Sequence, residues 1–79
     1  MNTKPIPKHQ KRQLEVLGVY LRNLRINHNM TIWEVSEQIP LHRNTIQRIE
    51  SGSNSTLLSV IVLAEYFEVK TSELLSIID

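Results

Sequence analysis

The sequence predicts an all-α fold, a single compact domain of five short helices. Three observations predict it. Apolar residues make up 41% of the 79 residues, and they recur at spacings of three and four, which is the period of a helix with one buried face. Only two glycines interrupt regular structure, and capping and helix-ending residues divide the chain into short segments. A chain of this length buries only ~60% of its unfolded surface, so it holds one small core.

Cysteine is absent, which excludes disulfides, thiolate zinc sites and thiol catalysis. The longest apolar run, residues 60–64, is far short of the ~20 residues that span a membrane. Residues 1–13 also lack the apolar run of a signal peptide. We therefore expect a cytoplasmic protein.

The beginning of the chain differs in composition from the rest. Residues 1–13 contain two prolines and almost no apolar anchor, and their cations are Lys4, Lys8, Lys11 and Arg12. This composition predicts a basic, flexible N-terminal arm over residues 1–13, followed by a folded domain over residues 14–79. Such an arm can follow a duplex backbone or enter a minor groove, and it can equally be a solubilising tail.

Charge is distributed unevenly along the chain. Residues 1–48 contain eight of the nine Lys and Arg and three of the eight acids, a net charge of +5. Residues 49–79 contain one cation and five acids, a net charge of −4. A polyanion is therefore expected to dock on the first part of the chain.

The first two helices follow from apolar spacing and capping. From Leu14 onward one helical face repeats, which predicts a first helix to about residue 27 or 28; this face carries Leu14, Leu17, Gly18, Leu21, Leu24 and Arg25. Thr31 and Glu34 have the spacing of a capping box, so a second helix is expected to start at Ile32. Pro40 lacks an amide donor and restricts its predecessor, so that helix ends by Ile39.

The remaining three helices have similar signals. Gly52 can take the left-handed conformation that ends a helix, and it predicts that a third helix, over residues 43–51, stops there. Ser55 or Thr56 can cap a fourth helix that runs to about Phe67. A fifth helix is expected to begin near Thr71 or Ser72 and to reach Ile78.

The third helix has two chemically different faces. At ~100° per residue, Ile46 and Ile49 point to one side. The opposite side carries Arg43, Asn44, Gln47 and Arg48. Guanidinium and amide groups match the paired donors and acceptors of guanine and adenine in the major groove. Taken alone this would be an ordinary solvated face, but a short capped helix, a tight turn and a second short helix together make a helix-turn-helix.

Several stretches of the sequence point to the same motif. They are Leu17-Gly18 and Leu21-Arg22-Asn23-Leu24-Arg25 in the first helix, Met30-Thr31 and Glu34-Val35-Ser36 in the second, Asn44-Thr45-Ile46-Gln47-Arg48-Ile49-Glu50-Ser51-Gly52 in the third, and Leu63-Ala64 and Glu73-Leu74-Leu75 near the end. Jointly they resemble the Xre-type, Cro and phage-repressor-like helix-turn-helix proteins over about residues 17–75. The resemblance implies a five-helix, repressor-like domain.

The resemblance also implies roles for particular residues. In that family the third helix lies in the major groove, so the base-reading residues would be Arg43, Asn44, Gln47 and Arg48. Phosphates would be held by the start of the second helix, at Thr31 and Ile32, and by the loop at Gly52 and Ser53. A structural ion pair would join Arg25 to Glu50.

The sequence departs from the family pattern at two positions. The turn position that is usually Gly is Pro40, which cannot adopt positive φ, so the turn must differ locally. Ile32 stands where the family often has a polar residue, so it can offer a phosphate only its backbone amide.

Other polar and aromatic residues receive simpler interpretations. We expect Trp33 to cover an edge of the core rather than stack on a base. His9, His28 and His42 are too scattered for a metal site, and no cofactor is expected; His42 can begin the third helix and touch a phosphate. No catalytic constellation stands out, so we expect a protein that is not an enzyme.

The fourth helix is apolar almost all round, more than one side of a small core requires. With the fifth helix it can form the surface of a homodimer, although a more thoroughly packed core is an alternative. The leading hypothesis is a dimeric, sequence-specific transcriptional regulator of double-stranded DNA, acting as a repressor. The alternative is a protein-interaction module such as the antitoxin of a toxin–antitoxin pair, in which the same surface grips a protein partner.

Overall fold

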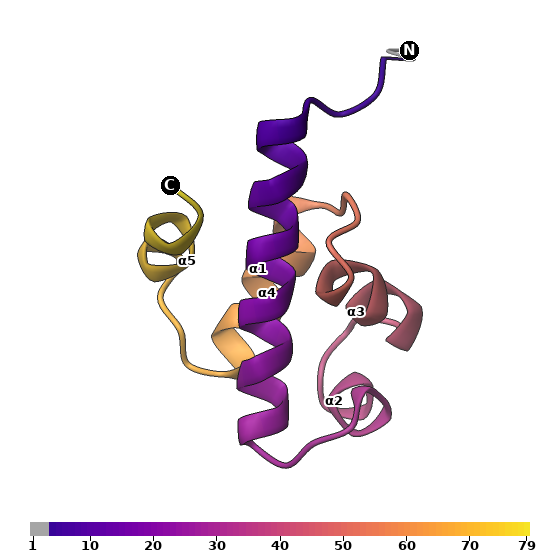
Figure 1. Cartoon of the computed structure of the whole chain (residues 1–79). Coiled ribbons are helices and arrows are strands. Elements are labelled where there is room, and N and C mark those ends of the chain that lie inside the picture. The colour runs from indigo at the N-terminus through magenta and orange to yellow at the C-terminus, as the bar shows by residue number, and fades with distance from the viewer. Residues whose placement is uncertain (1–3) are drawn as a thin grey trace.

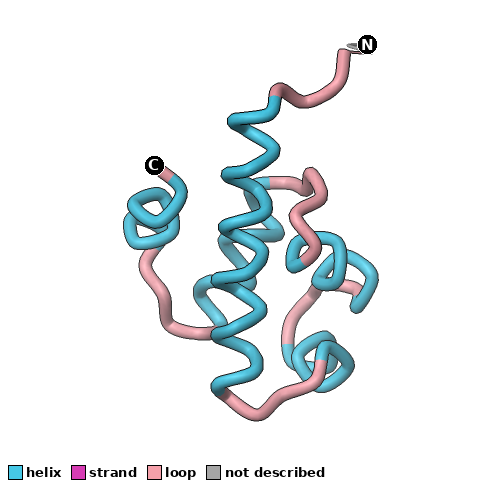
Figure 2. Tube along the Cα trace, in the orientation of Figure 1, coloured by secondary structure: helices cyan, strands magenta, loops and turns pink. Residues whose placement is uncertain are grey.

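The computed structural model describes residues 4–79 of the chain, and these residues form five helices and no strand. The helices are α1 (Lys8–Asn27), α2 (Ile32–Gln38), α3 (Arg43–Glu50), α4 (Leu57–Tyr66) and α5 (Thr71–Ile78). Figure 1 shows α1 running through the middle of the molecule, with α2 and α3 to one side and α5 to the other. Short loops join the helices, as Figure 2 shows. The predicted all-α, five-helix fold is confirmed.

Helix α1 begins at Lys8, six residues before the predicted start at Leu14. The backbone amide of Lys11 donates to the carbonyl of Pro7 at 2.9 Å, which forms the first turn. Residues 8–13 are mostly good helix formers but carry no apolar periodicity, the signal from which the start was predicted. The part of the predicted arm over residues 8–13 is therefore helical. Residues 4–7 precede the helix, and residues 1–3 lie outside the described residues.

Helix α2 begins and ends where the sequence predicts. Thr31 and Glu34 form the capping box: the amide of Glu34 donates to the Thr31 hydroxyl at 3.1 Å, and the amide of Thr31 donates to the Glu34 carboxylate at 2.9 Å. The hydrogen bond from the Thr31 amide, together with the nearby Thr31 hydroxyl, lowers the pKa of Glu34, because both stabilise the charged carboxylate.

The turn between α2 and α3 accommodates Pro40 without a left-handed residue. Ile39 is extended, with φ −134°, and the amide of Leu41 donates to the carbonyl of Ile39 at 2.8 Å. Among the described residues, positive φ occurs at Asn29, Gly52 and Glu68, none of which lies in this turn. The local difference that Pro40 requires is therefore a tight turn centred on a proline at negative φ.

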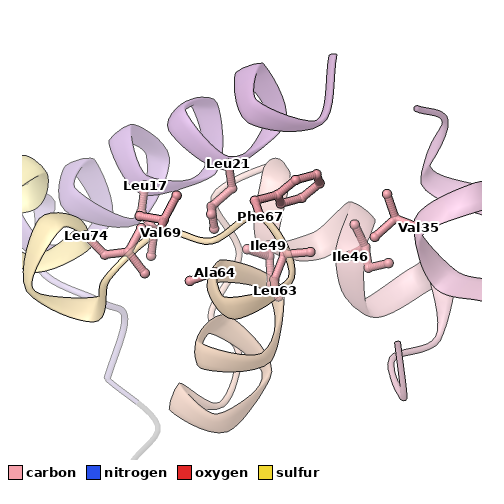
Figure 3. Close-up of a cluster of buried hydrophobic side chains, with 10 residues drawn as sticks. All are labelled: Leu17, Leu21, Val35, Ile46, Ile49, Leu63, Ala64, Phe67, Val69 and Leu74. Atoms are coloured by element: carbon pink, nitrogen blue, oxygen red, sulfur yellow. The ribbon is translucent and has the colours of Figure 1, made fainter. Parts of the chain in front are cut away.

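One hydrophobic core joins all five helices, as Figure 3 shows. Phe67 and Val69, in the link between α4 and α5, complete it. The helical members are Leu17 and Leu21 of α1, Val35 of α2, Ile46 and Ile49 of α3, Leu63 and Ala64 of α4, and Leu74 of α5. Outside the core, the Gln13 side chain of α1 donates to the carbonyl of Ile78 at 2.7 Å and ties down the end of α5.

Helices α1 and α3 approach each other closely at Gly18. A Cβ at this position would lie 2.5 Å from the carbonyl oxygen of Ile49 and 2.6 Å from that of Glu50. Glycine inside a helix costs about 1 kcal/mol relative to alanine. The chain nevertheless has glycine here because any side chain would enter the backbone of α3.

We predict that Gly18→Ala destabilises the protein, although alanine is the better helix former. Overpacking of this kind costs about 1–3 kcal/mol, which exceeds the gain in helix propensity. Urea denaturation followed by circular dichroism would measure the change in the free energy of unfolding. An unchanged or increased stability would contradict the close approach of α1 and α3.

Candidate nucleic-acid interface

Helix α3 presents a polar face to solvent and an apolar face to the core. Ile46 and Ile49 are buried, as predicted. The four polar residues predicted to face outward are all exposed: Arg43, Asn44, Gln47 and Arg48. The structure therefore brings two guanidinium and two amide groups together on one accessible helix surface.

The end of α3 is fixed to α1 by an ion pair between Arg25 and Glu50. Arg25 Nε donates to Glu50 Oε2 at 2.8 Å, and Nη2 donates to Oε1 at 2.9 Å. The two side chains are only 12% and 6% exposed. The pair that the resemblance implies is thus present in a bidentate geometry, and the hydrogen bonds from Arg25 to Glu50 raise the pKa of the guanidinium.

Arg25 also reaches the loop before α2. Its Nη1 donates to the carbonyl of Met30 at 2.8 Å. One guanidinium therefore joins α1, the end of α3 and the entry to α2. These contacts restrict how the two helices of the motif can move relative to α1.

His42 is the N-cap residue of α3. The backbone amide of Asn44 donates to His42 Nδ1 at 3.0 Å. In the neutral ring the proton then resides on Nε2, which is a hydrogen-bond donor. The cap and the predicted phosphate contact use different ring nitrogens, so His42 can serve both.

The loop after α3 is closed by Gly52, whose φ is +84°. The amide of Ser53 donates to the carbonyl of Arg48 at 2.9 Å and that of Gly52 to the carbonyl of Ile49 at 3.1 Å, which is the Schellman pattern. The sequence signal for this helix end is therefore confirmed.

The first turns of α1, which precede the predicted start of the helix, lie beside this loop. Lys11 and Glu15 line a shallow hollow together with residues 51–54 and with Pro5 and Ile6 of the preceding segment. A cation of α1 therefore borders two of the predicted phosphate contacts, Gly52 and Ser53. The sequence places this lysine in the predicted arm, and no local signal connects it with the loop after α3.

The start of α2 holds the other two predicted phosphate contacts. Thr31 is exposed, but its hydroxyl and amide both bond to Glu34. The Ile32 side chain packs against the core, which leaves its backbone as the part that can face a ligand.

The expectation for Trp33 is wrong. Instead of covering a core edge, its side chain is 55% exposed. The guanidinium carbon of Arg43 lies 4.6 Å from the centre of its ring, a cation–π contact between α2 and α3. Val35, two residues further along α2 and on the opposite side of the helix, is the residue of α2 that is fully buried in the core.

These elements define a helix-turn-helix protein: a capped short helix, a tight turn and a second short helix with an exposed polar face. The family model described as helix-turn-helix matches residues 21–74, well over half of the chain. The chain belongs to this family, the Xre-, Cro- and phage-repressor-like helix-turn-helix proteins, whose members are DNA-binding regulators.

Searches of curated proteins and of solved structures returned no match. Among residues 4–79, no helix has the length and apolar character needed to cross a membrane. The same residues contain no cluster of three or more His, Cys, Asp or Glu side chains that could hold a metal ion.

We predict that His42→Ala destabilises α3 by about 1 kcal/mol, the usual loss when an N-cap acceptor is removed. His42→Asn is the matched control, since asparagine supplies a side-chain oxygen to the same amide. Thermal unfolding of the three proteins would compare them. An equal loss in both variants would contradict the capping role.

Proposed function

We propose that the protein is a sequence-specific transcriptional regulator that reads the major groove of double-stranded DNA with α3. The exposed polar face of this helix, inside a helix-turn-helix frame, is the observation that carries the proposal. The major groove is wide enough to admit one helix. Because α3 is fixed at its end by the Arg25–Glu50 pair, its outward side chains keep a constant orientation toward the groove.

The base contacts would come from Arg43, Asn44, Gln47 and Arg48. Arginine can donate two hydrogen bonds to O6 and N7 of guanine, whereas asparagine and glutamine pair with N6 and N7 of adenine. Each such bidentate contact discriminates against the wrong base by about 1–3 kcal/mol.

Phosphate contacts would flank α3 on both sides. Thr31, Ile32 and His42 lie at the amino ends of α2 and α3, and Gly52 and Ser53 lie in the loop after α3. Backbone amides and small polar side chains suit this role. Lys11 borders the loop and would add an electrostatic contact that weakens with salt.

We further propose that two copies associate through α4 and α5. Leu57, Leu58 and Leu75 are 71%, 70% and 61% exposed, an unusual cluster of exposed leucines for so small a domain. Leu57 and Leu75 line an apolar groove between α1, α4 and α5, and Leu58 follows Leu57 on α4. The other apolar walls of the groove are Leu14, Leu17, Val60, Ile61, Leu74 and Ile78. Two copies would present two recognition helices to half-sites ~34 Å apart, which compensates for the few bases that one helix can read.

Repression is the regulatory mode we propose. A dimer bound across a promoter would exclude the polymerase sterically and would require no further contact. An antitoxin-like role remains an alternative, because the exposed leucines would also fit a protein partner.

The function is tested by selecting duplexes from a random pool at a stated salt concentration. We expect the wild-type protein to enrich one motif with two half-sites. Arg43→Ala and Arg48→Ala should each weaken binding to that motif by about 5- to 150-fold, the equivalent of one bidentate contact. The proposal fails if no motif is enriched and both variants bind as the wild type does.

The dimer is tested by sedimentation equilibrium. Leu57→Glu puts a charge into the groove of the proposed interface and should raise the dimer dissociation constant at least about tenfold, the effect of 1.4 kcal/mol. Val19→Glu is the matched control, since Val19 is 57% exposed on α1 and lies outside the groove. A wild-type monomer, or equal effects of both substitutions, would contradict dimerisation. A monomer that forms a stable complex only with a foreign protein would favour the antitoxin-like alternative.

A further inference from the structure

The contact between Trp33 and Arg43 lies outside the hydrophobic core. Trp33 is the second residue of α2 and more than half exposed, and Arg43 is the first residue of α3 and also exposed. The ring and the guanidinium carbon are 4.6 Å apart. Two exposed side chains of the two motif helices therefore meet at the surface, next to the face that we assign to DNA.

The contact restricts the conformations of the Arg43 side chain but leaves its hydrogen-bond donors unused. A guanidinium that stacks on an aromatic ring keeps its N–H groups in its own plane, directed away from the ring. Within the described part of the chain, Arg43 makes no ion pair or hydrogen bond, whereas Arg25 uses three of its nitrogens. The donors of Arg43 are therefore available to an external acceptor such as a base, whereas those of Arg25 are used within the protein.

An arginine at a helix start has several rotatable bonds, and binding a base edge would normally cost the freedom of all of them. The indole ring already limits this freedom in the unbound protein. A side chain that is ordered before binding loses less on binding, so the ring should increase both affinity and selectivity at the base that Arg43 reads.

We propose that Trp33 is a positioning residue that holds Arg43 in the orientation required for a bidentate contact with one base of the operator. This inference rests on the proposed function, since it assigns Arg43 a base. It makes Trp33 a determinant of specificity without giving the indole a contact to DNA of its own.

A double-mutant cycle on the selected duplex tests the proposal. Trp33→Ala should weaken binding about 2- to 5-fold, the range of an exposed cation–π contact, and should relax the preference at a single base position. In an Arg43→Ala background it should have no further effect. Arg48→Ala is the matched control background, where Trp33→Ala should retain its full effect because Arg48 makes no contact with the ring.

Two results of the cycle would overturn the proposal. An equal loss from Trp33→Ala in the wild-type and Arg43→Ala backgrounds would show that the indole contacts DNA or acts on the fold. An unchanged base preference in Trp33→Ala would show that it does not set specificity. A structural loss would weaken binding to all duplexes alike, so unselected DNA serves as the reference.

Fluorescence tests the contact without any DNA. Trp33 is the only tryptophan, so emission excited at the red edge of the absorption band, where the two tyrosines do not absorb, reports on it alone. We expect Arg43→Ala to change the emission intensity and the access of a neutral quencher, and Arg48→Ala to change neither. If both substitutions leave the emission unchanged, Trp33 does not hold Arg43. If the wild-type protein enriches no duplex while the fluorescence result holds, the proposed function fails and the contact itself stands.

Discussion

Helix α1 meets the end of α3 at two points, and the orientation of the polar face depends on both. At Gly18 the two backbones are so close that a side chain would not fit. Seven residues later, Arg25 donates two hydrogen bonds to Glu50. The first contact sets the distance between the helices, and the second limits rotation of α3 about its axis. A largely buried ion pair is weak evidence for stability, because desolvation offsets much of its attraction, but this bidentate pair defines the geometry well. Its third bond, to Met30, extends this constraint to α2.

Much of this fold could be predicted because its signals are local. The capping box at Thr31 and Glu34, Pro40 after α2 and Gly52 after α3 each act within a few residues, so the ends of the middle helices follow from neighbouring side chains. The outward face of α3 followed from helical periodicity alone. The start of α1 did not, because residues 8–13 form a helix on propensity and a backbone bond to Pro7, without an apolar stripe.

The features that the sequence could not predict depend on the angle between helices. Trp33 and Arg43 are ten residues apart on different helices, and they meet only because the proline-centred turn sets their relative direction. Likewise, Lys11 comes beside the loop after α3 only because α1 extends toward the N-terminus and packs on α3. Periodicity shows which side chains share a face, but it does not show which faces of different helices converge. The Trp33–Arg43 contact and the position of Lys11 both enlarge the surface around α3.

We propose that the exposed face of α3 is the surface with which this protein binds DNA. Backbone amide chemical shifts, recorded by NMR during titration with the selected duplex, would test it most directly. We expect the largest changes on α3 and on its flanks at the start of α2 and in the loop after α3, with the indole N–H of Trp33 among them. Changes that concentrate on the leucines of α4 and α5 while α3 stays unperturbed would contradict it.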